Sequence, residues 1–232
     1  GVGLSVHGQY RIATNKTMFA MPETAIGFFC DVGGSYFLPR LQRNLGTYLA
    51  LTGARLIGPQ VAIAGVATHY VPEEKLNSLL EELLSSSPEE IEKILGSFSV
   101  PIQSLTSNLD PKDTLSETNL KAIERCFGEP TMERIMAKIE AEEEKEFAKI
   151  CLKLLSKMSP TSLKVVLQQM IRGKDLDFKQ CFDMEHKMAL RFMKENDFFE
   201  GVRALLVDKD KSPKWNPANI SEVDEKQVLR YF

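Results

Sequence analysis

The hydrophobic and polar positions of the first 72 residues change in short stretches, which predicts small strands and short helices in turn. Small and apolar residues over 1–8 favour a short helix, while 9–14 and 17–21 have the pattern of extended segments. An amphipathic helix is predicted over 34–44, with a break at Pro39 because proline lacks a backbone N–H. The pattern further predicts helices over 46–51 and 58–64, which end at Gly53 and Gly65, and a strand over 66–71.

The sequence becomes helical in character after Pro72. Leucines recur at helical spacing through 73–95, and Gly96 is predicted to end this helix because glycine adopts the left-handed conformation without steric cost. Residues 97–117 are rich in Ser, Thr, Asn, Asp and Pro, which indicates an irregular connection. Helices are then predicted over 117–127, 131–158, 162–171, 175–195 and 198–206.

The longest of these helices, 131–158, carries an acidic run at 140–146, which is most simply a solvated surface. The change of character after Pro72 predicts two regions. Residues 1–72 form an α/β part, and residues 73–232 form a helical region that closes the core and carries candidate contacts for a homo-oligomer.

The composition is that of an ordinary globular protein, with 43% hydrophobic and 26% charged residues among 232 and a formal net charge of −3. No nucleic-acid partner is expected, since such proteins usually carry a strongly basic face. No membrane partner is expected either, since no apolar run approaches the ~18 residues of a spanning helix. The histidines and cysteines lack metal-ligand spacing, which predicts no metal site. The four cysteines are predicted to be buried thiols of a reducing compartment, and they are Cys30, Cys126, Cys151 and Cys181.

Two carboxylates, Glu23 and Asp31, flank a glycine-containing turn in otherwise apolar sequence. Apolar surroundings disfavour a charged carboxylate and raise its pKa, which suits the group to proton transfer or nucleophilic attack. The pair therefore favours an enzyme. Each residue also has a simpler interpretation, with Glu23 as a solvated acid after Pro22 and Asp31 as the N-cap of a helix that begins near Gly33.

The order of short motifs in 1–72 resembles the crotonase superfamily of enoyl-CoA hydratases and isomerases. One such motif alone is weak evidence, whereas the ordered set is specific. In chain order the motifs are Pro22-Glu23, Gly33-Gly34, Leu38-Pro39-Arg40, Leu51-Thr52-Gly53 with Leu56, and Ala64-Gly65-Val66-Ala67. The resemblance implies an α/β, crotonase-like fold, a spiral of ββα units with an incomplete N-terminal part. Residues 1–72 would be the C-terminal part of its α/β core.

Further motifs resemble the 3-hydroxyisobutyryl-CoA hydrolases within this superfamily. They extend the resemblance almost from end to end, most weakly over 73–145. In chain order they lie at 3–8, 19–24, 31–34, 67–69, 158–163, 200–204, 208–209 and 212–215. The resemblance implies hydrolysis of the thioester of 3-hydroxyisobutyryl-CoA, and of similar short 3-hydroxyacyl-CoAs, to the free hydroxy acid and CoA in valine catabolism.

The same resemblance implies roles for three residues. Glu23 would lie at the thioester carbonyl and either attack it, forming an anhydride, or activate water as a general base. Asp31 would meet the 3-hydroxyl of the substrate and could also serve in proton transfer. Gly1, at a helix N-terminus, would let its backbone approach the thioester, where free N–H groups favour negative charge. CoA would enter as part of the acyl-CoA substrate, and no separate cofactor is expected.

Two other functions stay open, namely hydration or isomerisation of an enoyl-CoA and non-catalytic binding of CoA or a protein partner. Asp31 favours the hydrolase, because hydratases of the superfamily tend to have a small residue at that point. The chain starts Gly-Val-Gly without an initiator Met and matches only the tail of the family's glycine-rich run. We therefore expect the 232-residue chain alone to have little or no activity. The resemblance implies the mitochondrial matrix, with the peroxisome and the cytoplasm left open and no targeting segment in this chain.

Overall fold

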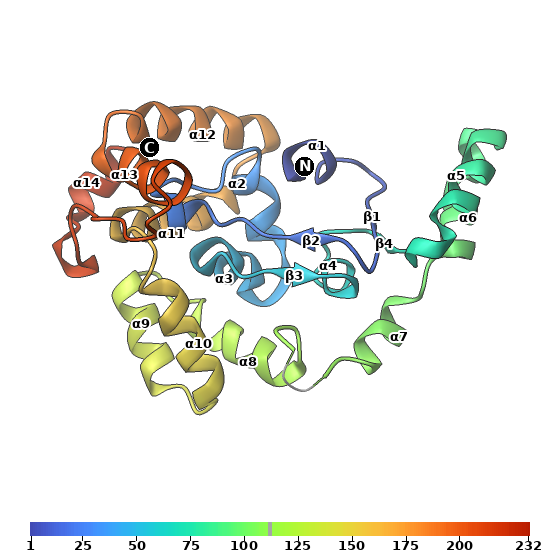
Figure 1. Ribbon diagram of the computed structural model, residues 1–232, viewed down its shortest axis with the longest axis horizontal. Helices are drawn as coiled ribbons and strands as arrows, with labels where there is room; N and C mark the ends of the chain where they lie inside the picture. The colour runs from blue at the N-terminus through green and yellow to red at the C-terminus, as the bar shows by residue number, and fades with distance from the viewer. Residues whose placement is uncertain (111–112) are drawn as a thin grey trace. The chain divides into compact units, whose positions relative to one another are not determined.

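The computed structural model describes residues 1–110 and 113–232 of the chain (Figure 1). The chain forms two compact units. The first unit comprises Gly1–Phe19 and Arg55–Glu117, and the second comprises Ala20–Ala54 and Thr118–Phe232. The sequence pattern predicts a division after residue 72, based on a change in the character of the sequence. The boundaries of the two compact units fall at other positions, so the predicted division stays a prediction.

The first unit contains two small sheets and begins with helix α1, Val2–Ser5. Strand β1, Ile12–Ala13, pairs in parallel with β4, His69–Tyr70. Strand β2, Met18–Phe19, pairs antiparallel with β3, Leu56–Ile57. Strands β1, β2 and β4 lie inside the segments that the sequence pattern predicts to be extended, although each has only two residues. A short helix α4, Pro59–Ile63, follows β3, as predicted.

The leucine-rich segment that follows forms two helices where the sequence pattern predicts one. Helix α5 is Leu76–Ser85 and α6 is Ile91–Phe98. The break falls at Ser87, whose side chain forms a reciprocal capping box with Glu90 and so starts a new helical turn. The prediction that Gly96 ends the helix is wrong. This glycine lies within α6, where a Cβ would meet no atom within 4 Å, so no packing constraint requires a stop there.

The predicted irregular connection after α6 contains one further helix, α7, Ile102–Ser107. Residues 111–112 of that connection lie outside the described residues. The helices α5 and α6 bury a small apolar cluster with the end of the β4 segment. Its buried members are Val71, Leu79, Ile94 and Leu95.

The second unit begins with a series of short helical turns. They are η1 Glu23–Ile26, α2 Gly34–Phe37, η2 Leu38–Arg40, η3 Gln42–Asn44 and α3 Leu45–Thr52. The predicted break at Pro39 is confirmed, since the α-helical turn ends at Phe37 and a 3₁₀ turn carries the proline. The predicted stop after Thr52 is also confirmed, because Gly53 takes the left-handed conformation with φ 61°.

The rest of the second unit is helical, and α11, Pro160–Gly173, lies at its centre. This helix packs against α2, α3 and α9, and its buried face includes Val165 and Val166. The other helices are α8 Glu117–Cys126, α9 Met132–Ala141, α10 Lys145–Leu155, α12 Phe178–Phe192, α13 Asn196–Val202 and α14 Glu225–Leu229. A π-helical turn η6, Arg203–Val207, continues α13, and a 3₁₀ turn η7, Ile220–Glu222, precedes α14.

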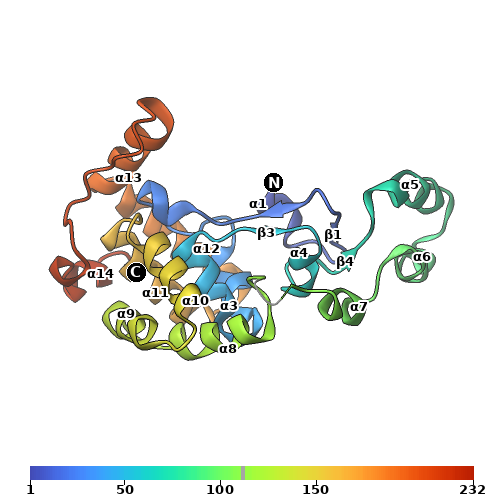
Figure 2. The same ribbon diagram turned by 60° about the horizontal axis from the view of Figure 1, so that its bottom comes forward.

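The long helix predicted over 131–158 is divided into α9 and α10, which lie side by side (Figure 2). The interpretation of the acidic run as a solvated surface is wrong at Glu142, which is only 5% exposed. Its carboxylate accepts a hydrogen bond from Arg125 Nη2 at 2.6 Å and another from the Glu143 backbone N–H at 2.9 Å. The bond from Arg125, together with hydrogen bonds from the Glu144 N–H and the Cys126 thiol, lowers the pKa of Glu142 to about 2. The buried carboxylate lies between the end of α9 and the start of α10, where it accepts hydrogen bonds from the backbone of the bend.

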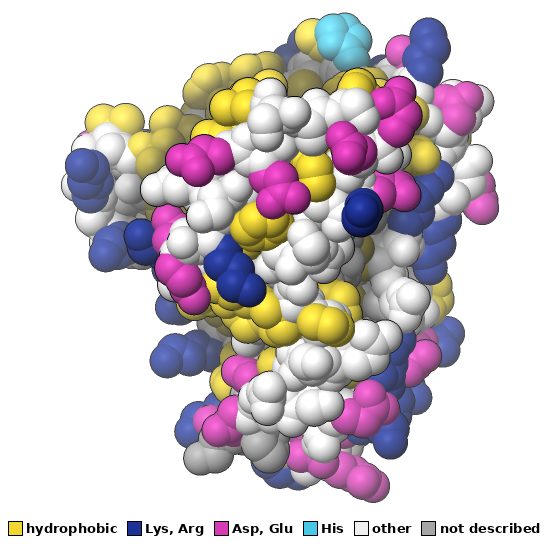
Figure 3. Space-filling view, turned by 90° about the vertical axis from the view of Figure 1, so that its right-hand side faces the viewer, with side chains coloured by type: hydrophobic (Ala, Val, Ile, Leu, Met, Phe, Trp, Pro, Cys, Tyr) yellow, Lys and Arg dark blue, Asp and Glu magenta, His cyan; other side chains and the backbone are white. Residues whose placement is uncertain are grey.

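The four cysteines are buried and not in disulfides, as predicted. Within the described ranges, no helix combines the length and the apolar character needed to span a membrane. Acidic and basic side chains are interspersed with hydrophobic ones on the face shown in Figure 3, in keeping with a formal net charge of only −3.

Candidate active site

Glu23 is the first residue of the 3₁₀ turn η1, directly after Pro22. The turn closes with hydrogen bonds from the Phe28 N–H to the Glu23 carbonyl at 3.0 Å and from the Gly27 N–H to the Thr24 carbonyl at 3.3 Å. Gly27 has φ 70°, a left-handed conformation that ends the turn and that glycine adopts without strain. The Pro-Glu motif thus fixes a tight turn with Glu23 at its start.

Hydrogen bonds to Thr24 hold this turn on the helices behind it. Ser159 is the residue directly before α11, and its N–H donates to the Thr24 carbonyl at 3.0 Å. The Thr24 hydroxyl donates to the carbonyl of Leu51 in α3 at 3.3 Å. Thr24 is fully buried, so both bonds are shielded from water. The backbone next to Glu23 is therefore anchored to two different helices.

Two glycines allow the turn to contact α13 backbone to backbone. A Cβ on Gly27 would overlap the carbonyl of Asp197, and a Cβ on Gly201 would overlap the carbonyl of Ile26. The two close approaches are reciprocal, since each glycine faces the backbone of the other element. They explain why glycine occupies both positions, and they set the distance between Glu23's turn and the C-terminal helices.

The Glu23 carboxyl group is largely buried, and among the described residues its Oε2 atom has no hydrogen-bond partner. Burial raises the pKa of Glu23 to about 7, and the negative charge of Asp31 adds to that increase. Hydrogen bonds from its own backbone N–H and from the Cys30 thiol partly offset the effect. The interpretation of Glu23 as a solvated turn acid does not fit this burial.

Asp31 lies close enough to Glu23 for the two carboxylates to repel each other. It is half-buried, and burial raises its pKa as well, partly offset by a hydrogen bond from its own backbone N–H. The structure therefore places the two predicted acids in one electrostatic environment, each disfavoured in its charged form.

The N-cap interpretation of Asp31 is wrong. The N-cap of α2 is Gly33, and no side chain caps the helix from that position. The carboxylate of Glu185 on α12 takes this place. It accepts hydrogen bonds from the Gly33 N–H through Oε2 and from the Ser35 N–H through Oε1, both at 2.9 Å.

A second buried polar side chain, Gln169 on α11, braces the same segment. Its Nε2 donates to the Cys30 carbonyl at 2.6 Å and to the Ser35 hydroxyl at 2.8 Å. Gln169 is fully buried and Glu185 is 5% exposed. Sequence reasoning missed both residues. A signal was available, because Glu185 lies at helical spacing from Cys181 and Met188 and so falls on the apolar face of its helix.

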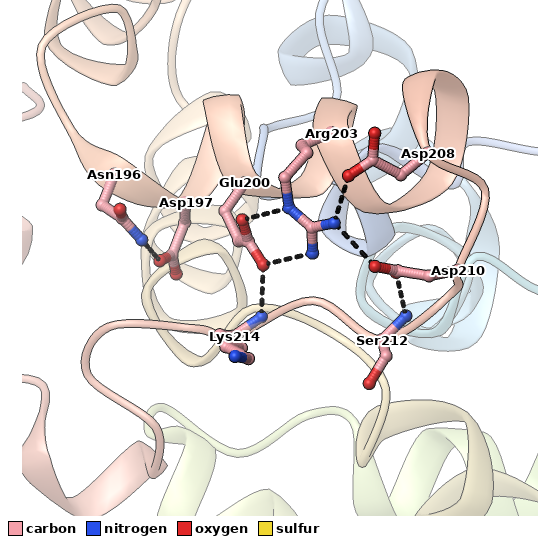
Figure 4. Close-up of polar contacts among 8 residues, drawn as sticks. All are labelled: Asn196, Asp197, Glu200, Arg203, Asp208, Asp210, Ser212 and Lys214. Carbon is pink, nitrogen blue, oxygen red and sulfur yellow. Dashed lines mark hydrogen bonds and ion pairs between the residues drawn. The ribbon is translucent and has the colours of Figure 1, made fainter.

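The C-terminal motifs come together around Arg203 (Figure 4). Its guanidinium donates two hydrogen bonds to Glu200, both at 2.8 Å, and one each to Asp208 and Asp210 at 2.6 Å. The Lys214 N–H donates to Glu200 at 2.7 Å. These contacts join residues 200–204, 208–210 and 214 into one clasp. The clasp fastens the exposed C-terminal segment to α13, the helix against which Glu23's turn packs.

Asp197, one turn before Glu200 on α13, is buried and links this clasp to α11. It accepts hydrogen bonds from the Ser159 hydroxyl at 2.6 Å and from the Asn216 N–H at 2.9 Å. Ser159 also donates its N–H to Thr24. Motifs that are widely separated along the sequence therefore converge behind the turn of Glu23.

Gly1 lies at the N-terminus of α1, where its carbonyl accepts hydrogen bonds from the Leu4 and Ser5 N–H groups at 3.1 and 3.2 Å. It belongs to the first unit, whereas Glu23 and Asp31 belong to the second. Its part in binding the thioester stays a prediction. Among the residues that the structure describes, no three His, Cys, Asp or Glu side chains form a group that could hold a metal ion.

The site brings together two partly buried carboxylates on consecutive turns, which are held by contacts from α3, α11, α12 and α13. This arrangement is suited to acid–base or nucleophilic chemistry. The family model described as enoyl-CoA hydratase/isomerase matches residues 1–232, so the chain belongs to this family. Two solved structures share the fold. A carnitinyl-CoA dehydratase from Mycobacterium thermoresistibile has a TM-score of 0.85 and 32% identity, with 100% of this chain and 63% of that chain covered. An enoyl-CoA hydratase from Rhodobacter sphaeroides 2.4.1 has a TM-score of 0.81 and 31% identity, with 99% and 63% covered. The expected crotonase-like fold class is confirmed.

Relatives of higher identity carry a more specific name. The chain is 48% identical over 236 residues to the mitochondrial 3-hydroxyisobutyryl-CoA hydrolase of Dictyostelium discoideum, and equally to that of Homo sapiens. Each alignment covers 100% of this chain and 60% of the relative. The predicted resemblance to these hydrolases is confirmed, and the chain spans about 60% of the length of these curated relatives.

Proposed function

We propose that the full-length protein hydrolyses the thioester of 3-hydroxyisobutyryl-CoA and of similar short 3-hydroxyacyl-CoAs. In this reaction Glu23 acts at the thioester carbonyl and Asp31 binds the 3-hydroxyl. The observation that supports the proposal most directly is the partly buried Glu23, whose pKa is raised to about 7 and whose Oε2 has no hydrogen-bond partner among the described residues. The 48% identity to hydrolases of that name supports the choice of substrate.

The raised pKa suits the group to either of two routes. A carboxyl with a pKa near 7 is partly ionised at neutral pH, and its anion is a stronger base than an ordinary solvated glutamate. It could attack the carbonyl carbon, forming an anhydride and releasing the CoA thiolate, which then takes up a proton; water would cleave the anhydride. Alternatively it could take a proton from a water molecule that attacks the carbonyl. Both routes require ionised Glu23, so kcat/KM should rise with pH through about 7.

Asp31 would recognise the hydroxyl group of the acyl chain. A half-buried carboxylate accepts a hydrogen bond from a hydroxyl, and an acyl chain without that hydroxyl leaves the carboxylate unpaired. The repulsion between Asp31 and Glu23 would also be relieved when the substrate hydroxyl shields one of the charges. The expected result is a preference for 3-hydroxyacyl-CoAs over their non-hydroxylated counterparts.

The test is thiol release from 3-hydroxyisobutyryl-CoA by the full-length protein, compared with its Glu23→Gln and Asp31→Asn variants. We expect Glu23→Gln to lower kcat by at least about 10²-fold, the magnitude typical of a general base. We expect Asp31→Asn to act mainly on the preference for the hydroxylated substrate. Full activity in both variants would contradict these roles.

A second candidate function is hydration or isomerisation of an enoyl-CoA, because the two solved structures with this fold are named a dehydratase and a hydratase. Loss of the conjugated absorbance of crotonyl-CoA without thiol release would favour it. A protein that binds CoA thioesters but converts neither substrate would favour the non-catalytic alternative.

We further propose that the full-length protein acts in valine catabolism in mitochondria, since the relatives at 48% identity are named mitochondrial. Fractionation of cells that express the full-length protein would test the compartment, and recovery in the cytosolic fraction would contradict it. A homo-oligomer stays a prediction, which sedimentation of the full-length protein would test.

A further inference from the structure

The turn between Asp31 and Ser35 contains one backbone hydrogen bond of its own, from the Gly34 N–H to the Asp31 carbonyl at 2.9 Å, and two residues of unusual conformation. Val32 has φ 52° and Gly33 has φ 87°, so two consecutive residues lie in the left-handed region. That conformation is strained for a β-branched residue such as valine and persists only where the surroundings enforce it. The turn immediately follows Asp31, so its conformation fixes the backbone on the C-terminal side of that residue and thereby helps to place Asp31.

We propose that Glu185 is a positioning residue of the active site, which holds the Asp31 turn in its strained conformation through a bidentate contact. This role rests on the proposed function, in which Asp31 binds the substrate hydroxyl. Glu185 itself touches the backbone of the turn and need not touch substrate.

The contact is well suited to this role. Both oxygens of Glu185 are used, one for the Gly33 N–H and one for the Ser35 N–H, each at 2.9 Å. Hydrogen bonds from backbone N–H groups to an ionised acceptor are about twice as strong as neutral ones. The side chain is 5% exposed, so water does not compete for these donors. One rigid helix thereby fixes two points of a turn that lies about 150 positions earlier in the chain.

Gln169 completes the restraint at the two ends of the turn. It binds the carbonyl of Cys30, just before Asp31, and the hydroxyl of Ser35. Two buried side chains from neighbouring helices therefore hold residues 30–35. Three carboxylates, Glu23, Asp31 and Glu185, share this region, and burial raises the pKa of each. A buried glutamate without hydrogen-bond partners would destabilise the folded state. The contact with the turn removes this cost and so allows Glu185 to be present.

The simplest substitution is Glu185→Gln, which keeps the size of the side chain but supplies only one acceptor oxygen. Its amide NH₂ would face one of the two backbone N–H groups, which breaks the bidentate contact. Glu142→Gln is the matched control. Glu142 is equally buried, at 5% exposure, and also accepts a backbone N–H, but it lies in the bend between α9 and α10.

Two measurements test the proposal in the full-length protein. The first is the ratio of kcat/KM for 3-hydroxyisobutyryl-CoA to that for isobutyryl-CoA, which lacks the hydroxyl. We expect Glu185→Gln to lower this ratio on the order of 10²-fold, the loss that a displacement of about 1 Å produces. Isobutyryl-CoA hydrolysis should change much less, because Glu23 is held by a different set of contacts. Glu142→Gln should leave the ratio within about twofold, since it acts on stability alone.

The second measurement is amide hydrogen exchange, which does not depend on activity. In Glu185→Gln we expect faster exchange at Gly33 and Ser35, with the segment around Glu23 unchanged, and no such change in Glu142→Gln. If hydrolysis by the unmodified protein prefers the hydroxylated substrate and Glu185→Gln keeps that preference, the positioning role is wrong while the proposed function stands. Unchanged exchange at both amides would also overturn the role. If the unmodified protein hydrolyses neither thioester, the proposed function fails, and the role assigned to Glu185 fails with it.

Discussion

Replacement of Glu23 by glutamine should stabilise the second unit at high pH and leave it nearly unchanged at low pH. The folded chain raises the pKa of Glu23 from an ordinary 4.5 to about 7. Between these values the folded state holds a proton that the unfolded state has lost, so the stability contributed by this group falls as pH rises from 4.5 to 7. Above pH 7 the folded protein carries a buried anion, which glutamine does not.

The magnitude follows from the pKa difference. At about 1.4 kcal/mol per pKa unit, the interval from 4.5 to about 7 corresponds to roughly 3 kcal/mol. Partial contact with water reduces this value, and about 2 kcal/mol is a reasonable expectation. For a protein of this size that difference shifts Tm by about 4–8 °C. The variant should therefore melt several degrees above the unmodified chain at pH 8 and close to it at pH 4.

The assay is thermal unfolding followed by circular dichroism at intervals between pH 4 and pH 8. Glu142→Gln is the control with the opposite sign. The pKa of Glu142 is lowered to about 2, so its carboxylate stabilises the folded state above pH 4.5, and that stability is lost as pH falls through about 2. Glu142→Gln should thus destabilise the chain most at neutral pH. A Tm difference for Glu23→Gln that is the same at pH 4 and pH 8, or that favours the unmodified chain at pH 8, would refute the burial argument.

Three further predictions concern packing. Gly201→Ala should destabilise the chain by at least about 2 kcal/mol in urea unfolding, because the added Cβ would overlap the carbonyl of Ile26, whereas Gly96→Ala meets no atom and should stabilise α6 by about 0.5–1 kcal/mol. Equal effects of the two would contradict the reciprocal glycine contact. Arg203→Ala should release the segment 208–216 and speed its limited proteolysis. Unchanged cleavage would show that the contacts of Arg203 do not hold this segment in place. The four buried thiols should react with a thiol reagent only after unfolding, so rapid labelling of the native chain would contradict their burial.

The sequence by itself determined the features that depend on neighbouring residues. Proline at 39 and glycine at 53 end helical segments where predicted, because their effects on the backbone act within one turn. The ordered motifs identified the family, and the apolar setting of Glu23 predicted its raised pKa. Each of these inferences uses information that lies within a few positions of the residue concerned.

The tertiary structure alone decided which distant side chains meet. Gly96 was expected to end a helix, yet the capping box at Ser87 placed the break earlier and the helix continued through the glycine. Glu142 was expected in solvent, yet Arg125 and the interhelical bend bury it. Glu185 reaches the Asp31 turn only because α12 packs against α2. Periodicity predicts which face of a helix is buried, but the partner of a buried charge depends on how elements far apart in the chain pack together.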